Sequence, residues 1–236
     1  MSDAGRHDSN RESQAIVERY ARRRGADPRY SILKPDVWMT LQERQRAVLR
    51  RLALQESDPA KLRLLEVGCG EGGNLLELIR IGFEPGHLTG IELIEDRFDA
   101  ACERLPGAVQ MHRGDALAVD LDSASQDIVL VSTVFSSILD TATQHALAAA
   151  MWRWLTPGGA VLWYDIAVDN PHNPDVRGIA RARLRQLFPE GRLEARRITL
   201  APPIARKVCR LHPSLYTAFN TIPLLRTHLL AWITKT

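Results

Sequence analysis

One stretch, residues 64–76, limits the possible fold more than any other part of the sequence. It reads L-L-E-V-G-C-G-E-G-G-N-L-L and holds four glycines between apolar segments. The apolar residues before the glycines predict a buried strand, and Leu75, Leu76 and Ile79 behind them have helical spacing. Glycine allows positive φ and close approach of a ligand to the backbone, and the start of the helix offers free N–H groups. The stretch therefore predicts a nucleotide-binding turn between a strand and a helix.

The glycine spacing is compatible with more than one adenosine cofactor. Gly68, Gly70 and Gly73 fit G-x-G-x-x-G, the dinucleotide fingerprint, and Glu92 lies near the offset at which an acid contacts a ribose. An NAD-dependent oxidoreductase is therefore one hypothesis at this point.

The acid in front of the glycines favours a different cofactor. Glu66, Gly68, Gly70 and Gly72 fill an acid-x-G-x-G-x-G pattern, which resembles motif I of the class I S-adenosylmethionine (SAM) methyltransferases. A carboxylate there suits a ligand that carries an ammonium and a sulfonium, and it suits a pyrophosphate poorly. A second stretch, L-T-P-G-G-A-V-L at 155–162, also resembles this family. The resemblance implies a Rossmann-like α/β fold: a seven-stranded, mostly parallel sheet with an antiparallel final strand and helices on both faces.

Length and composition indicate one domain with appendages. The chain has 236 residues, 45% of them hydrophobic, with a net charge of +3. No apolar run approaches the roughly 18 residues needed to cross a bilayer. The polar N-terminus has no signal-peptide pattern, and the three scattered cysteines indicate neither disulfides nor a metal site. We expect a cytoplasmic protein without a metal.

The domain boundaries follow from these patterns. We expect a disordered lead-in over residues 1–12, N-terminal helices over 13–58 that cover the cofactor cleft, and the methyltransferase domain over 59–236. Asp36 is the predicted cap of the second of these helices. A helical insertion is expected at about 201–225, basic at first and apolar later. It would either cover the sheet or form a lid over the acceptor, and the lid would rest on a membrane surface to reach a lipid-linked substrate.

The resemblance also implies cofactor contacts at the ends of successive strands. Glu92, at the end of a strand over 87–92, would accept hydrogen bonds from the ribose hydroxyls, because the carboxyl ends of parallel strands form the ligand side of the sheet. Asp115 and Ala116, after a strand over 108–112, would contact the adenine. The predicted cofactor-binding residues are Glu66, Gly68, Cys69, Gly70, Glu92, Leu93, Asp115, Ala116, Ser132 and Thr133.

The acceptor would meet the cofactor after the fourth and fifth strands, over 127–132 and 155–165. The predicted substrate-binding residues are Phe135, Tyr164, Asn170 and Arg177. A hydroxyl acceptor needs a base within hydrogen-bond reach, and Asp165 and His172 are the two candidates. The loop from 165 to 179 is rich in Asn, Asp, His and Pro, so ordinary turn chemistry is an equal alternative for it.

The favoured function is methyl transfer from SAM to a small-molecule or glycan acceptor, at a hydroxyl, with S-adenosylhomocysteine (SAH) as the product. Residues 131–136 read V-S-T-V-F-S, which lacks the N-P-P-Y motif of amino-group methylation. An RNA methyltransferase is the alternative, because residues 176–212 carry ten Arg or Lys and two Glu, a balance of +8. A non-catalytic SAM-binding protein is the third hypothesis. The oligomeric state does not follow from the sequence.

Overall fold

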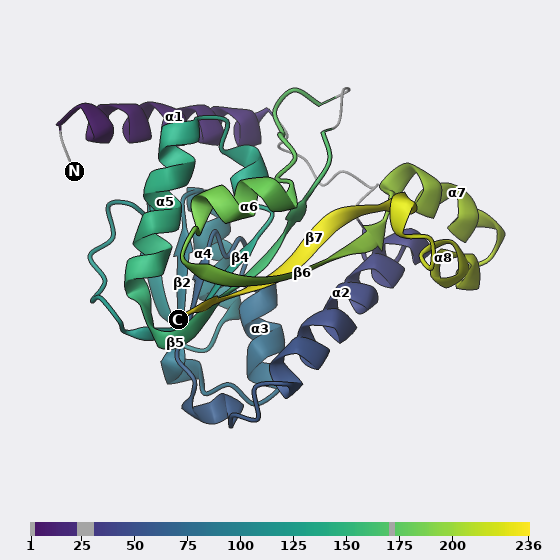
Figure 1. The fold of residues 1–236 in the computed structure, drawn as a ribbon, viewed down its shortest axis with the longest axis horizontal. Helices are drawn as coiled ribbons and strands as arrows, with labels where there is room; N and C mark the ends of the chain where they lie inside the picture. The colour runs from purple at the N-terminus through teal and green to yellow at the C-terminus, as the bar shows by residue number, and fades with distance from the viewer. Residues whose placement is uncertain (1–2, 23–30, 170–172) are drawn as a thin grey trace.

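A central sheet of seven strands forms the middle layer of the protein in the computed structural model, which describes residues 3–22, 31–169 and 173–236 (Figure 1). The strand order is β3-β2-β1-β4-β5-β7-β6. The first five strands run parallel, whereas β7 is antiparallel to both of its neighbours. The strands are β1 (Leu64–Val67), β2 (Leu88–Glu92), β3 (Gln110–Arg113), β4 (Gln126–Ser132), β5 (Leu155–Ile166), β6 (Gly191–Leu200) and β7 (Arg226–Lys235).

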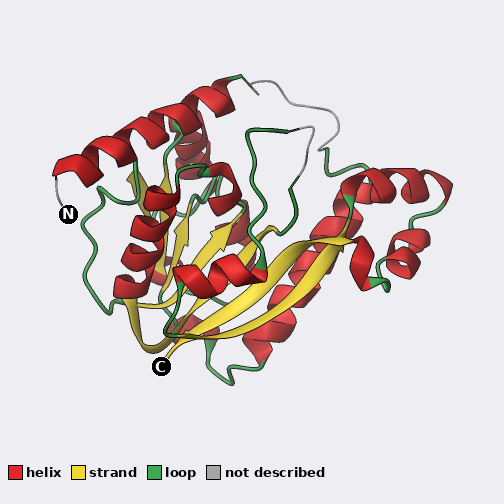
Figure 2. Cartoon of the chain, turned by 45° about the horizontal axis from the view of Figure 1, so that its top comes forward, coloured by secondary structure: helices red, strands yellow, loops and turns green. Residues whose placement is uncertain are grey.

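Helices cover both faces of the sheet (Figure 2). One core, which includes Leu147 and Leu184, packs α5 and α6 against one face. A second core, with Ala47, Leu75 and Ala101, packs α2, α3 and α4 against the other face. The helices are α1 (Asp3–Ala21), α2 (Pro35–Ala53), α3 (Gly73–Arg80), α4 (Glu95–Arg104), α5 (Thr141–Trp154), α6 (Arg181–Leu187), α7 (Pro202–Leu211) and α8 (Ser214–Phe219). This arrangement confirms the predicted fold class.

The N-terminal region differs from the prediction at two points. Helix α1 begins at Asp3, so most of the stretch 1–12 is helix where a disordered lead-in was expected. Once the later turns of α1 are fixed by packing, each further residue adds a backbone hydrogen bond without a new nucleation cost. Helix α2 begins at Pro35 with Lys34 as its N-cap, so Asp36 lies inside the first turn and does not cap the helix. Proline at the first position sets this start, because it has no N–H to satisfy.

The insertion between β6 and β7 is helical, and it does not cover the face of the sheet. Its buried residues, among them Val208 and Tyr216, form a separate small core with Met39 of α2 and Leu200 at the end of β6. Figure 1 shows α7 and α8 at the far end of β6 and β7, away from α1. None of the helices in the described ranges is long and apolar enough to cross a membrane.

Candidate functional site

The glycine turn joins β1 to α3 at the carboxyl edge of the sheet. Gly68 and Gly70 have φ values of +68° and +58°, which L-residues adopt at a cost. A Cβ on Gly68 would lie 2.6 Å from Cγ2 of Val134, the second residue after β4. Glycine is therefore required at Gly68 for both its backbone angle and the space around it.

Glu92 fixes this turn from the end of β2. Its Oε2 accepts a 2.7 Å hydrogen bond from the N–H of Gly70, and its Oε1 accepts one of 2.8 Å from the N–H of Ile94. Glu92 as a whole residue is only 4% exposed. A carboxylate has about four acceptor positions, so each oxygen of Glu92 keeps capacity for one more donor.

A cavity opens above the carboxyl ends of β1, β2 and β4. It encloses about 810 Å³ of empty space, its open mouth included. Seven of the ten predicted cofactor residues line it: Gly68, Glu92, Leu93, Asp115, Ala116, Ser132 and Thr133. Glu66, Cys69 and Gly70 lie beside it in β1 and the glycine turn, outside its lining. Thr133 has a positive φ of 55°, a strained angle for a β-branched residue and one that is common at ligand sites.

Helix α1 forms one wall of this cavity. Ser13, Ile16 and Tyr20 of α1 line it. Asp115 Oδ2 accepts a 2.8 Å hydrogen bond from Ser13 Oγ, and its Oδ1 accepts one of 2.9 Å from the Leu117 N–H. The predicted adenine site is thus contacted by α1.

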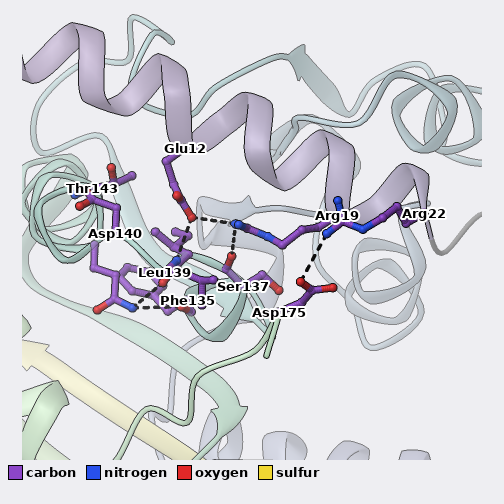
Figure 3. Close-up of polar contacts among 11 residues, drawn as sticks. Glu12, Arg19, Arg22, Phe135, Ser137, Leu139, Asp140, Thr143 and Asp175 are labelled. Carbon is purple, nitrogen blue, oxygen red and sulfur yellow. Dashed lines mark hydrogen bonds and ion pairs between the residues drawn. The ribbon is translucent and has the colours of Figure 1, made fainter. Parts of the chain in front are cut away.

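A buried ion pair holds α1 on the segment after β4 (Figure 3). Glu12 and Arg19 are 2.7 Å apart, and their side chains are only 12% and 10% exposed. Arg19 also donates to the carbonyl of Ser137 at 2.9 Å, while Glu12 accepts from the N–H of Leu139 at 2.8 Å. Both charges therefore have partners on the sheet domain, which offsets the cost of their burial.

A polar chain runs from β1 to the end of β4. Asn74 donates to Glu66 Oε1 at 2.6 Å and accepts from Arg44 of α2 at 2.8 Å, and Arg44 also reaches Ser132 Oγ at 3.3 Å. Burial raises the pKa of Glu66 to about 7, while Asn74 and the nearby Arg44 act in the opposite direction. The second oxygen of Glu66 is buried without a hydrogen-bond partner. This chain places one cation, Arg44, beside one end of the cavity.

A second, mostly apolar cavity lies between α2, α3 and the sheet. Arg44, Asn74 and Ser132 line one end of it, and Ser132 lines both cavities. Its walls include Leu78 of α3, Leu162 of β5 and Leu230 of β7. The two cavities therefore meet at the carboxyl end of β4.

Comparison with known proteins identifies the domain. Residues 64–159 match the family model described as a methyltransferase domain. A solved SAM-dependent methyltransferase of Thermotoga maritima, described as a possible histamine N-methyltransferase, has the same fold with a TM-score of 0.64 and 18% identity, over 94% of this chain and 99% of that one. The chain contains a class I methyltransferase domain. SAM is the cofactor of this family, and solved structures of the same fold include complexes with SAM and with SAH.

Two curated relatives of this methyltransferase domain differ in what their names say they methylate. A fatty-acid O-methyltransferase of Mycolicibacterium smegmatis is 29% identical over 174 residues, which cover 65% of this chain and 59% of that protein. A dTDP-amino-sugar N,N-dimethyltransferase of Streptomyces venezuelae is 35% identical over 107 residues, 44% of this chain and 42% of that protein. The chain thus spans about half the length of the curated relatives it matches. The matches agree on the domain and differ in the acceptor.

The chemistry of the first cavity fits SAM. Glu92 has acceptor capacity left at the end of β2, which suits the ribose hydroxyls of SAM. Glu66 lies beside the cavity with one oxygen unpartnered, and its carboxyl group suits a cofactor that carries an ammonium and a sulfonium. Arg44 supplies a cation that suits the cofactor's carboxylate. No sequence pattern points to Arg44, because it lies in an ordinary amphipathic helix.

Asp165, a predicted base, is placed away from both cavities. It is 1% exposed, and its oxygens accept from the N–H of Ser136 at 3.0 Å and of its neighbour Ile166 at 2.8 Å. Burial raises the pKa of Asp165 to about 6, against the effect of these hydrogen bonds. The prediction of Asp165 as a base is thus not supported by its placement, which instead fixes the backbone of the segment after β4.

The predicted substrate-binding residues do not lie together in one cavity. Phe135 is fully buried against Trp163, with ring centroids 4.6 Å apart, so its ring packs in the core and is not placed to contact an acceptor. Tyr164 lines the second cavity, and its hydroxyl is 2.9 Å from the hydroxyl of Thr199. Arg177 is exposed on the loop after β5, where its N–H donates to the carbonyl of Ser136 at 2.9 Å.

The remaining predicted site residues are Asn170, His172 and Cys69. Asn170 and His172 lie outside the described residues. Cys69 is buried, and desolvation raises the pKa of its thiol well above the usual range, so the thiol is not a nucleophile near neutral pH. Within the described ranges, no group of three or more His, Cys, Asp or Glu is placed to hold a metal ion.

Proposed function

We propose that the protein transfers the methyl group of SAM to an oxygen atom of a small-molecule or glycan acceptor. The observation that carries this proposal is the fixed, nearly buried carboxylate of Glu92, which faces a cavity bounded by Asp115 and by Ser132. Parallel strands bring these three residues to one edge of the sheet, where ligands of such sheets bind.

The chain's own residues would hold the cofactor by complementary charge and hydrogen bonding. Glu92 would accept from the ribose, and Asp115, which lines the cavity after β3, would contact the adenine. Arg44 would pair with the carboxylate, and the charge of Glu66 would act on the ammonium. SAM supplies an electrophilic methyl group whose transfer neutralises the sulfonium. The protein's part is therefore to align the acceptor with the cofactor and to exclude water.

The acceptor is proposed to enter where the two cavities meet, at Ser132. Asp165 is bound to backbone N–H groups and does not line either cavity, so it is not available to take a proton from a hydroxyl. Carboxylates and acidic phenols ionise without help near neutral pH and need no such base. For an alcohol acceptor, His172 is the remaining candidate base that the sequence offers.

The test is methyl transfer from labelled SAM into an extract that is separated into nucleic acid, protein, glycan, lipid and small-molecule pools. Label in the small-molecule, glycan or lipid pool that disappears with Glu92→Gln supports the proposal. Label confined to an RNase-sensitive pool would replace it with RNA methylation. Tight SAH binding without transfer into any pool would favour the non-catalytic alternative.

A further inference from the structure

An arginine-lined groove lies between α2, β6 and the start of β7, and it shares no lining residue with the cofactor cavity. Arg46 and Arg50 of α2 line it together with Arg196 and Arg197 of β6 and Arg226 at the start of β7. Arg196 donates to the carbonyl of Ala47 at 3.3 Å, and Arg226 donates to the carbonyl of Asn220 at 2.7 Å. Carbonyls orient these two guanidinium groups without neutralising them. The charges of the groove therefore remain available to an anion.

The acid in the lining of the groove is already engaged by the protein. Glu43 accepts from the Tyr216 hydroxyl at 2.7 Å and from the Asn220 amide at 2.6 Å. It also accepts from the N–H of Thr199, at 3.1 Å to each oxygen. Even with its charge counted, five arginines against one glutamate leave the lining at +4. Among the described residues, neither Arg46 nor Arg50 forms a salt bridge with an acid.

The positions of Arg46 and Arg50 add to this excess of positive charge. They are four residues apart in α2 and both are exposed, so they are neighbours on one helix face. Like charges at this spacing destabilise a helix in the absence of a counter-ion. Arg226 and Arg196 come from other elements and converge on the same groove. A bound anion would relieve repulsion among all five arginines of the groove.

The rim of the groove is apolar and exposed. The loop from Asn220 to Arg226 begins and ends at groove residues, and the hydrogen bond between these two residues closes it. Between them, Ile222 is 45% exposed and Leu224 is 88% exposed. Just before the loop, Phe219 is 39% exposed. From residue 195 to the end of the chain there is no Asp or Glu, so no acid within the loop opposes contact with an anionic surface.

We propose that this groove and its rim dock the protein on a membrane surface that contains anionic phospholipids. The arginines would bind lipid phosphates, for which the planar guanidinium is well suited. Ile222 and Leu224 would enter the headgroup region beside them, because a cationic surface with adjacent apolar side chains is typical of interfacial binding. RNA would use the arginines equally well, but it would gain nothing from the exposed leucine and isoleucine.

The test is cosedimentation of the full chain with vesicles, measured without turnover so that it does not depend on the proposed methyl transfer. Vesicles of phosphatidylcholine alone are compared with vesicles that also contain phosphatidylglycerol. We expect binding to the anionic vesicles only. Arg46→Gln/Arg50→Gln and Ile222→Gln/Leu224→Gln should each weaken it by at least about tenfold. The matched control is Arg181→Gln/Arg185→Gln, which removes two exposed cations from α6 on the opposite face of the sheet.

Several results would overturn the proposal. One is equal binding by all three variants, and another is no preference for phosphatidylglycerol. Loss of binding in the arginine variant alone, together with arginine-dependent binding of a single-stranded RNA, would make the groove a nucleic-acid site. SAH binding by each variant at the affinity of the unmodified protein shows that the fold is intact. A protein that docks on vesicles but transfers no methyl group would contradict the proposed function and leave this inference standing.

Discussion

Gly68→Ala tests whether the glycine turn has the geometry described here. The added Cβ has two separate effects. A left-handed backbone angle costs an L-residue about 1–2 kcal/mol, and Gly68 has a φ of +68°. The Cβ would also lie 2.6 Å from Cγ2 of Val134, and overpacking of this kind costs about 1–3 kcal/mol.

The expected net effect is a loss of roughly 1–4 kcal/mol in the free energy of unfolding. It is smaller than the two costs together, because alanine also lowers the entropy of the unfolded chain by the equivalent of about 0.4–1 kcal/mol. The measurement is urea unfolding of the full chain, followed by circular dichroism. The control is Gly73→Ala. Gly73 is the first residue of α3, has no positive φ, and a Cβ there would have nothing within 4 Å. That variant should be neutral or more stable by up to about 1 kcal/mol.

A double-mutant cycle with Val134→Ala separates the two effects. Removing Cγ2 of Val134 should relieve the clash with the added Cβ, and only the cost of the backbone angle should remain. The coupling free energy between the two substitutions should therefore be about 1–3 kcal/mol. A Gly68→Ala variant within about 0.5 kcal/mol of the unmodified protein would refute the described turn. A destabilised variant with no coupling to Val134 would show that the segment after β4 does not approach Gly68 as described.

Three further predictions concern the cofactor cavity. Glu92→Gln should raise the Kd for SAH by roughly 10- to 150-fold, since charge-assisted hydrogen bonds contribute about 1.5–3 kcal/mol. The control, Glu95→Gln, changes an exposed acid and should leave the Kd unchanged. Equal affinities of Glu92→Gln and the unmodified protein in calorimetry would contradict the ribose role. Arg44→Gln should weaken SAH binding over the same range, and unchanged affinity would remove Arg44 from the site. Glu66, with a pKa raised to about 7 from 4.5, contributes stability that is present below pH 4.5 and lost as the pH rises through 7. The measurement is the free energy of unfolding of the unmodified protein and of Glu66→Gln, each at pH 5 and at pH 8. Between these two pH values, the unmodified protein should lose up to about 3 kcal/mol more than the variant. A difference between the two proteins that does not change with pH would contradict this assignment.

The edge of the sheet at which the predicted cofactor residues lie could be predicted from sequence, because it depends on local patterns. Glu92 ends one short predicted strand and Asp115 follows another, and parallel strands bring such ends to one edge. The glycines of the turn require positive φ, a property of the local backbone. For these positions, chain order and residue type determine the placement.

The acceptor side could not be predicted in the same way. Successive residues of a strand point to opposite faces, so Tyr164 lines a cavity while its neighbour Asp165 faces the segment after β4. The apolar run of β5 is buried on both faces and does not reveal which residue faces which side. Arg44 and Ser13 reach the site from helices distant in sequence, and no local pattern signals such contacts.

The central claim is that the cavity at the carboxyl edge of the sheet binds the methyltransferase cofactor. Its most direct test is calorimetric titration of the full chain with SAH and, separately, with NAD. We predict saturable binding of SAH at one site per chain and no heat of binding for NAD. Binding of NAD without SAH would contradict the assignment and restore the dinucleotide interpretation of the glycine turn.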